Sequence, residues 1–108
     1  MANNGTEGSV INRNTARVMM QSYRNSPAFA ANNGQEGVLF GKDHIEAILA
    51  QPGCVGIRIY YGKDGPLPGD PANLILVGTD ANNHDMSDLI VDMGIPCPTH
   101  CPPAGSKI

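Results

Sequence analysis

The chain has 108 residues and a formal net charge of −3 at pH 7, which suits a single domain with one small core. Its seven basic residues are scattered, so nucleic acid and anionic membrane surfaces are not expected partners. No apolar run approaches the roughly 18 residues of a membrane span, and residues 1–9 lack the charged start and apolar run of a signal peptide. We therefore predict a cytoplasmic protein, with a non-classical export route left open.

The N-terminal half predicts an arm followed by two helices. Residues 1–9 are polar and read as a flexible arm. Apolar and small residues spaced by four then predict a helix over 13–24, capped by Asn12 or Asn14 and ended before Pro27. A loop follows to Gly37. A second, short helix is predicted over 43–50, with Asp43 as its N-cap and Pro-Gly as its stop.

The C-terminal half predicts three strands and a tail. Residues 54–61 alternate, so Val55, Ile57, Ile59 and Tyr61 are expected to face the helices and Cys54, Gly56, Arg58 and Tyr60 the other side. Residues 62–73 form a proline-rich connection that excludes a strand, and further strands are predicted over 74–79 and 89–92.

Together these elements predict an α+β fold. Two N-terminal helices pack on one face of a three-stranded antiparallel β-meander, and an irregular proline-rich tail follows. The expected domain covers residues 10–101, and residues 102–108 form a C-terminal tail. With only five aromatic residues and no tryptophan, the core should be small. Exposed sheet edges and a small core favour a homo-oligomer or a protein partner.

Three cysteines provide the chemical site that the sequence offers. Cys54, Cys97 and Cys101, with His100, are ligand types that zinc prefers. Against a zinc site, the close pair has three intervening residues instead of two, and neighbouring His100 and Cys101 do not easily ligate one ion. A Cys97–Cys101 disulfide or redox pair is a second interpretation. Separate thiols packed under the sheet are the favoured one, with no cofactor and zinc as the alternative.

Other chemistry finds little support. The acidic stretch from Asp80 to Asp85 resembles a calcium loop, but an EF-hand needs a glycine at its sixth position and a glutamate at its twelfth, where this chain has Asp85 and Val91. A hairpin turn is the better interpretation. No serine elbow or glycine-rich phosphate loop is present, so no catalytic residue is predicted.

Four motifs carry a resemblance to a known family. They are Phe-Gly-Lys-Asp at 40–43, Gln-Pro-Gly-Cys-x-Gly-Ile-Arg-x-Tyr-Tyr-Gly at 51–62, Leu-Val-Gly-x-Asp at 76–80, and Pro-Cys-Pro-x-x-Cys at 96–101. The chain resembles a family of small uncharacterised bacterial proteins, seen mainly in Bacteroidetes-type genomes. The resemblance spans roughly residues 10–101 and implies no particular activity.

These observations favour a non-catalytic assembly or protein-binding module that self-associates through sheet edges and terminal arms. The alternative is a thiol-based metal-binding or redox protein that uses Cys54, Cys97 and Cys101.

Overall fold

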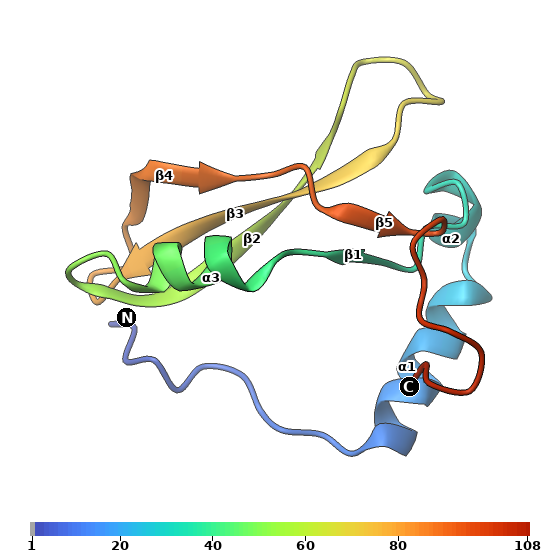
Figure 1. The fold of residues 1–108 in the computed structure, drawn as a ribbon, viewed down its shortest axis with the longest axis horizontal. Helices are drawn as coiled ribbons and strands as arrows, with labels where there is room; N and C mark the ends of the chain where they lie inside the picture. Colours follow the sequence, from blue (N-terminus) through green and yellow to red (C-terminus); the bar gives the residue numbers. More distant parts are fainter. Residues whose placement is uncertain (1) are drawn as a thin grey trace.

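The structure is a computed structural model that describes residues 2–108. Met1, the first residue of the predicted arm, lies outside the described residues. Within residues 2–108, three helices and five strands form in the order α1 (Arg13–Arg24), α2 (Pro27–Ala31), β1 (Gly37–Leu39), α3 (Lys42–Leu49), β2 (Cys54–Lys63), β3 (Ala72–Asp80), β4 (Asp85–Val91) and β5 (Ile95–Cys97) (Figure 1). The predicted α+β class is confirmed.

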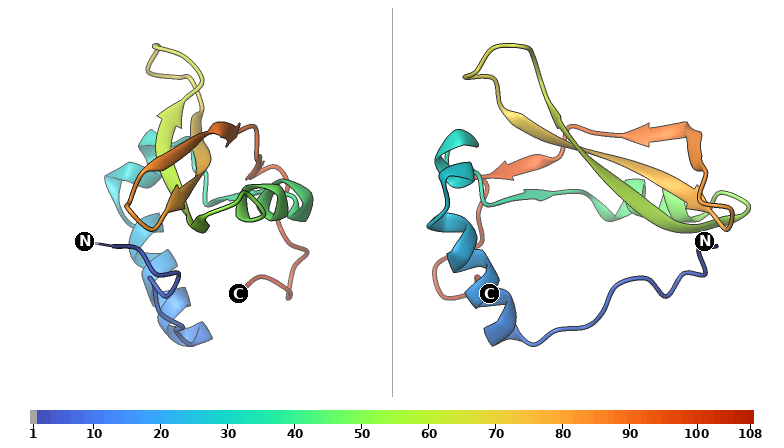
Figure 2. Two further views of the ribbon diagram at one scale, coloured as in Figure 1. Left: turned by 90° about the vertical axis from the view of Figure 1, so that its left-hand side faces the viewer. Right: turned by 180° about the vertical axis from the view of Figure 1, so that it is seen from behind.

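Two sheets carry the strands. The larger is the predicted antiparallel meander, with the order β2-β3-β4, and the smaller pairs β1 with β5. The small sheet was not predicted, because each of its strands has only three residues and β5 contains Pro96. Proline removes a donor, and edge strands tolerate that loss. Figure 2 shows the two sheets from two further sides.

Of the helices within residues 2–108, α3 makes the main contacts with the larger sheet. Its Ile48 is completely buried and forms the centre of the core with Leu76 and Val91. α1 begins where predicted, because the Asn12 side chain accepts a hydrogen bond of 2.8 Å from the Thr15 N–H. However, α1 has no buried residue and lies beside α2, away from the meander (Figure 1). The predicted packing of two helices on the sheet is therefore confirmed for α3 alone.

Two local predictions are wrong. The N-cap of α3 is Gly41, not Asp43, which lies in the first turn of the helix. Residues 27–31, predicted as part of a loop, form α2, with Pro27 at its start, where a missing N–H costs nothing. The meander begins and ends close to the predicted residues. However, β2 continues to Lys63 and β3 already begins at Ala72, so both strands extend into the predicted proline-rich connection.

A β-bulge changes which side chains of β2 face the core. The pairing of β2 with β3 shifts between Cys54 and Gly56, so one extra residue enters the strand. As a result Cys54 and Ile57 both pack against the core, although simple alternation puts them on opposite sides. The predicted outward orientation of Cys54 is wrong for this reason.

The molecule is open for its size. It exposes 7722 Å² of surface, whereas a folded monomer of 11.4 kDa exposes about 5,800 Å². Its radius of gyration is 15.6 Å, against about 13 Å expected for a compact chain of this length. None of the helices within residues 2–108 has the length and hydrophobicity needed to cross a bilayer.

Candidate functional site

A disulfide between Cys97 and Cys101 stands where the chain leaves β5. Cys97 is the last residue of β5, faces Gly37 in the register and is 9% exposed, whereas Cys101 lies on the surface. Their Cα atoms are 4.7 Å apart. The favoured prediction of separate thiols is therefore wrong for these two cysteines. The bond closes a tight turn, in which the His100 N–H donates to the Pro96 carbonyl at 3.0 Å.

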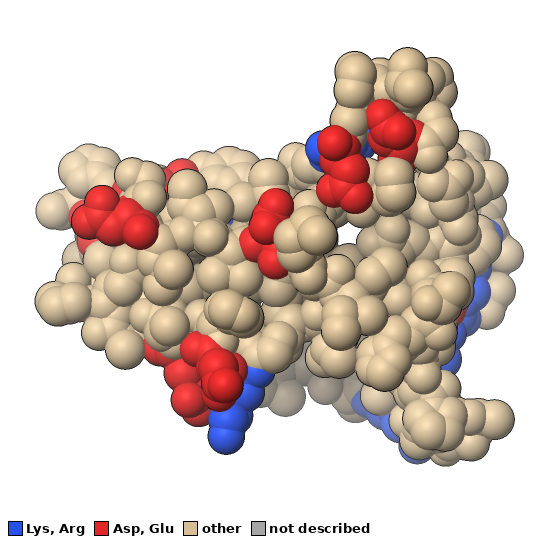
Figure 3. All heavy atoms as spheres, turned by 45° about the horizontal axis from the view of Figure 1, so that its top comes forward, with Lys and Arg blue, Asp and Glu red and all other residues tan. Residues whose placement is uncertain are grey.

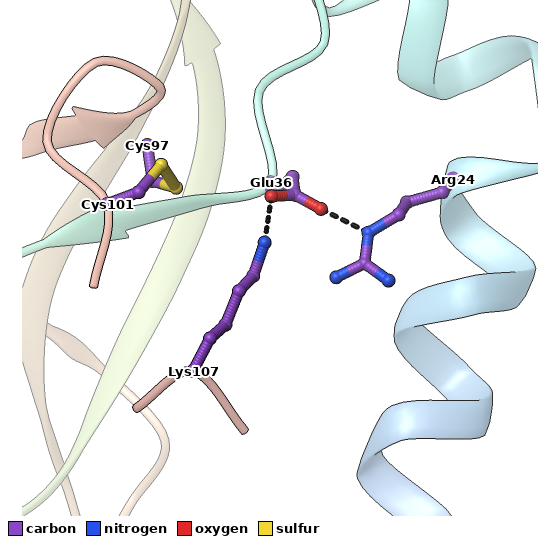
Figure 4. The surroundings of a disulfide bond; sticks show 5 residues. All are labelled: Arg24, Glu36, Cys97, Cys101 and Lys107. Atoms are coloured by element: carbon purple, nitrogen blue, oxygen red, sulfur yellow. Dashed lines mark hydrogen bonds and ion pairs between the residues drawn. A yellow bond between two sulfur atoms is a disulfide. The ribbon is translucent and has the colours of Figure 1, made fainter. Parts of the chain in front are cut away.

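Glu36 connects this disulfide to α1 and to the C-terminal tail (Figure 4). Its backbone N–H donates a 2.7 Å hydrogen bond to the Cys97 carbonyl. Its carboxylate, only 16% exposed, forms ion pairs with Lys107 of the tail and Arg24 of α1. The hydrogen bond from Lys107, followed by the one from Arg24, lowers the pKa of Glu36. The carboxylate therefore holds helix, strand and tail together in its ionised form.

The ligand atoms of Glu36, Cys97 and Cys101 all lie within 4.8 Å of one another. Metal binding needs thiolates, and a disulfide offers none. The group can coordinate a cation only after the disulfide is reduced. In the oxidised form the pair is a disulfide with Cys101 as its exposed residue, and disulfides of this kind react by thiol–disulfide exchange.

The structure does not bring the four predicted metal ligands together. Cys54 lies at the start of β2, beside α3, whereas Cys97 and Cys101 lie at the end of β5 beside α2 (Figure 1). Cys54 is a free thiol that donates a 3.3 Å hydrogen bond to the Gly56 carbonyl. His100 is exposed next to the disulfide. Among residues 2–108, the group of metal-type ligand atoms consists of Glu36, Cys97 and Cys101, and no sequence pattern marks Glu36.

A second notable feature is the outer edge of β2, the side of Cys54–Lys63 that faces away from β3. β2 is an end strand of the larger sheet. Three consecutive large side chains in it, Ile59, Tyr60 and Tyr61, are 53%, 44% and 92% exposed. Ile59 and Tyr61 point to one face of the sheet and Tyr60 to the other, and the backbone groups on the outer side of β2 have no partner strand among residues 2–108.

A groove of about 500 Å³ adjoins the far end of this edge. It lies between β1 and the far half of the β2–β3 hairpin, and its lining includes Tyr23, Val38, Tyr61 and Leu74. Figure 3 shows the surface hollowed beside the projecting hairpin, with acidic side chains in separate groups on a largely uncharged face. The groove and the β2 edge form one continuous region through Tyr61.

The opposite face of β2 carries a polar network. The guanidinium of Arg58 binds Asp85 at 2.6 Å and also contacts Asn83, while the Tyr60 hydroxyl donates to Asp85. The Asn83 side chain in turn accepts a 3.0 Å hydrogen bond from Asn3 of the N-terminal arm. The network therefore fastens the start of the arm to the β3–β4 turn and neutralises the central charge of β2.

Comparison with protein-family models, curated proteins and solved structures finds no match to this chain. The assignment of function therefore depends on the geometry described above, and the family resemblance stays a prediction.

Proposed function

We propose that this protein is a non-catalytic assembly or protein-binding module that self-associates. The observation that carries the proposal is its excess surface, roughly 2,000 Å² beyond that of a compact monomer of the same mass. A standard protein–protein interface buries about 800 Å² on each partner, so the excess is sufficient for a large interface.

The kind of surface supports the same proposal. α1 has no buried residue, and its Val18 and Met19 are more than half exposed. The core of five buried apolar residues is too small to explain a stable isolated chain of this length. Exposed apolar side chains on a helix and on a sheet edge are the surfaces that association with further copies would cover.

Light scattering coupled to size-exclusion chromatography tests this proposal. Purified protein should elute with a mass of at least twice 11.4 kDa at micromolar concentration and dissociate on dilution. A mass of one chain over the whole range from nanomolar to millimolar protein contradicts self-association.

A second candidate is a redox function of the Cys97–Cys101 pair, which the disulfide itself favours. A thiolate from a small dithiol would attack the exposed Cys101 sulfur, form a mixed disulfide and release Cys97 as a thiolate. The second thiol of the reductant would then displace Cys101. The protein gains two electrons and the dithiol becomes a cyclic disulfide. The Glu36 carboxylate lies within 4.8 Å of both sulfurs and is paired with Lys107 and Arg24, so its negative charge opposes the released thiolate less than a free carboxylate would.

Equilibration in dithiothreitol redox buffers tests the second candidate. A redox function predicts half-reduction at a potential above about −300 mV, the range of labile disulfides. Reduction only below that value identifies a structural disulfide and contradicts the candidate. Free Cys54, present in both states, serves as the internal reference for thiol counting.

The compartment connects the two candidates. The sequence predicts the cytoplasm, where disulfides are rare and are usually catalytic or redox-sensing. A cytoplasmic location would therefore favour the redox candidate, whereas export by a non-classical route would make the disulfide a structural element. Fractionation of cells that produce the protein separates these alternatives.

A further inference from the structure

We propose that self-association takes place between two β2 edges. A second copy of the chain adds its β2 antiparallel to β2 of the first, and the two three-stranded sheets become one six-stranded sheet around a two-fold axis. This inference rests on the proposed self-association and names the surface that performs it.

The larger sheet has two end strands, and they differ in regularity. In β4 the pairing jumps from Val77–Ile90 to Gly78–Met86, so residues 87–89 have no partners opposite them and the strand is interrupted. In β2 the single bulge lies at the start, and from Gly56 to Lys63 the pairing with β3 is continuous. Bulges protect an edge from pairing with another chain. The regular part of β2 lacks a bulge, although Asn3, Gly5 and Glu7 of the N-terminal arm lie beside its first residues, Val55–Arg58, and a second copy has to displace them there.

The charges of β2 do not oppose a second copy. The guanidinium of Arg58 is bound by Asp85 and Asn83 on one face of the sheet. Lys63, at the far end of the strand, donates a 2.7 Å hydrogen bond to the Leu67 carbonyl. Edges that stay single usually carry free charges, lysine above all. Between these two residues the strand is entirely uncharged, with the sequence Ile-Tyr-Tyr-Gly.

The register of such a pair follows from the pleat. In an antiparallel pair, residues that lie opposite each other have their side chains on the same face of the sheet. With a two-fold axis perpendicular to the sheet, this requires that one residue lies opposite its own copy. The run Gly56–Gly62 is centred on Ile59, which therefore lies opposite Ile59 of the second copy. Ile57 then faces Tyr61, and Arg58 faces Tyr60. Aromatic, aliphatic and cation–π pairs of these kinds stabilise neighbouring strands.

The exposed surface of the chain as a whole is sufficient for an interface with a second copy. The chain exposes roughly 2,000 Å² more than a compact monomer, and a stable pair needs about 800 Å² from each partner. The β2 edge contributes Ile59, Tyr60 and Tyr61, and the groove beside Tyr61 extends the same apolar region.

Charge substitution at Ile59 tests the proposal. Ile59→Lys and Ile59→Glu each place two like charges opposite each other. The dissociation constant of each variant dimer should therefore be at least about tenfold higher than that of wild type. Mixing the two variants should restore a heterodimer, because Lys then lies opposite Glu. Leu67→Lys, which introduces the same charge at an exposed apolar residue of the β2–β3 turn, should dimerise like wild type.

Several outcomes decide between the proposals. If wild type is an oligomer and Ile59→Lys leaves its mass unchanged, the β2 interface is overturned but self-association is not. The same conclusion follows if a mixture of the Lys and Glu variants stays monomeric. A wild type that is monomeric at every concentration overturns both. If Ile59→Lys fails to fold, hydrogen exchange on wild type replaces it. Alternate amides of 56–62 should gain protection when the protein is concentrated above its dissociation constant, and unchanged exchange there overturns the β2 interface.

Discussion

The Glu36 carboxylate binds the ammonium group of Lys107, a residue 71 positions further along the chain. The same carboxylate binds Arg24 of α1, so one side chain holds the C-terminal tail against the N-terminal helix (Figure 4). Because a depressed carboxyl pKa stabilises the fold only while the group is ionised, this connection is sensitive to acid.

Glu36→Gln should lower the free energy of unfolding by about 1 kcal/mol at neutral pH. The pKa of Glu36 is lower in the folded chain than its ordinary value of 4.5. Its contribution is therefore complete above that ordinary value and is lost as the pH falls through the lower, folded pKa. Denaturation of both proteins over a pH series should show their difference shrinking in acid. Glu46→Gln, in the exposed part of α3, is the matched control, and a pH-independent difference for Glu36→Gln contradicts the role.

Ile48→Ala should be among the most destabilising substitutions in the chain. Ile48 is 0% exposed and packs on Leu76 and Val91, so its truncation leaves a cavity and should cost about 2–5 kcal/mol. Urea denaturation at one fixed protein concentration measures the loss. Ile11→Ala, at a residue 50% exposed before α1, should change stability by less than about 0.5 kcal/mol. Equal effects at the two sites would contradict the location of the core.

Gly94→Ala should disturb the small sheet. A methyl group at Gly94 would overlap the Val38 side chain and lie 2.8 Å from the ring of Phe40. Overpacking of this kind costs about 1–3 kcal/mol. Gly37→Ala provides the control in the same sheet, because an added methyl group there meets nothing within 4 Å. Thermal unfolding should separate the two variants, and equal midpoints would argue against the close approach of residue 94 to β1.

Thiol titration should distinguish the cysteines. Protein denatured without reductant should show one thiol, Cys54, and three after reduction, because Cys97 and Cys101 form the disulfide. Opening the short loop should cost about 2 kcal/mol in the loop-entropy description of disulfides. Three thiols before reduction would instead support the separate-thiol interpretation.

The sequence predicts the elements whose signals are local. Asn12, one of the two residues predicted to cap α1, is its N-cap. The Pro-Gly pair predicted to stop α3 follows the end of that helix, close to residue 50. The inward position of Ile57 in β2 is predicted, but that of Cys54 is not, because a bulge at Cys54–Gly56 depends on the partner strand and has no signature in β2 itself.

The candidate site was predicted in part. The spacing of Cys97 and Cys101 marks them as a pair, and a disulfide between them is one of the interpretations that the sequence leaves open. Glu36 could not be found in this way, because its role depends on Arg24, on the tail and on the β1–β5 pair, all brought together by tertiary structure. The remoteness of Cys54 from the pair also follows from the path of the chain between the sheets.

The pairing of β1 with β5 means that the small sheet can form only after nearly the whole chain has been synthesised. Gly37–Leu39 leave the ribosome early, but their partner strand begins only at Ile95, after the whole meander has been made. During translation β2, β3 and α3 can assemble as neighbours in sequence, while β1 waits for most of the remaining chain. A released chain that ends at Gly94 should therefore contain a formed hairpin and an unpaired β1, a state open to chaperones.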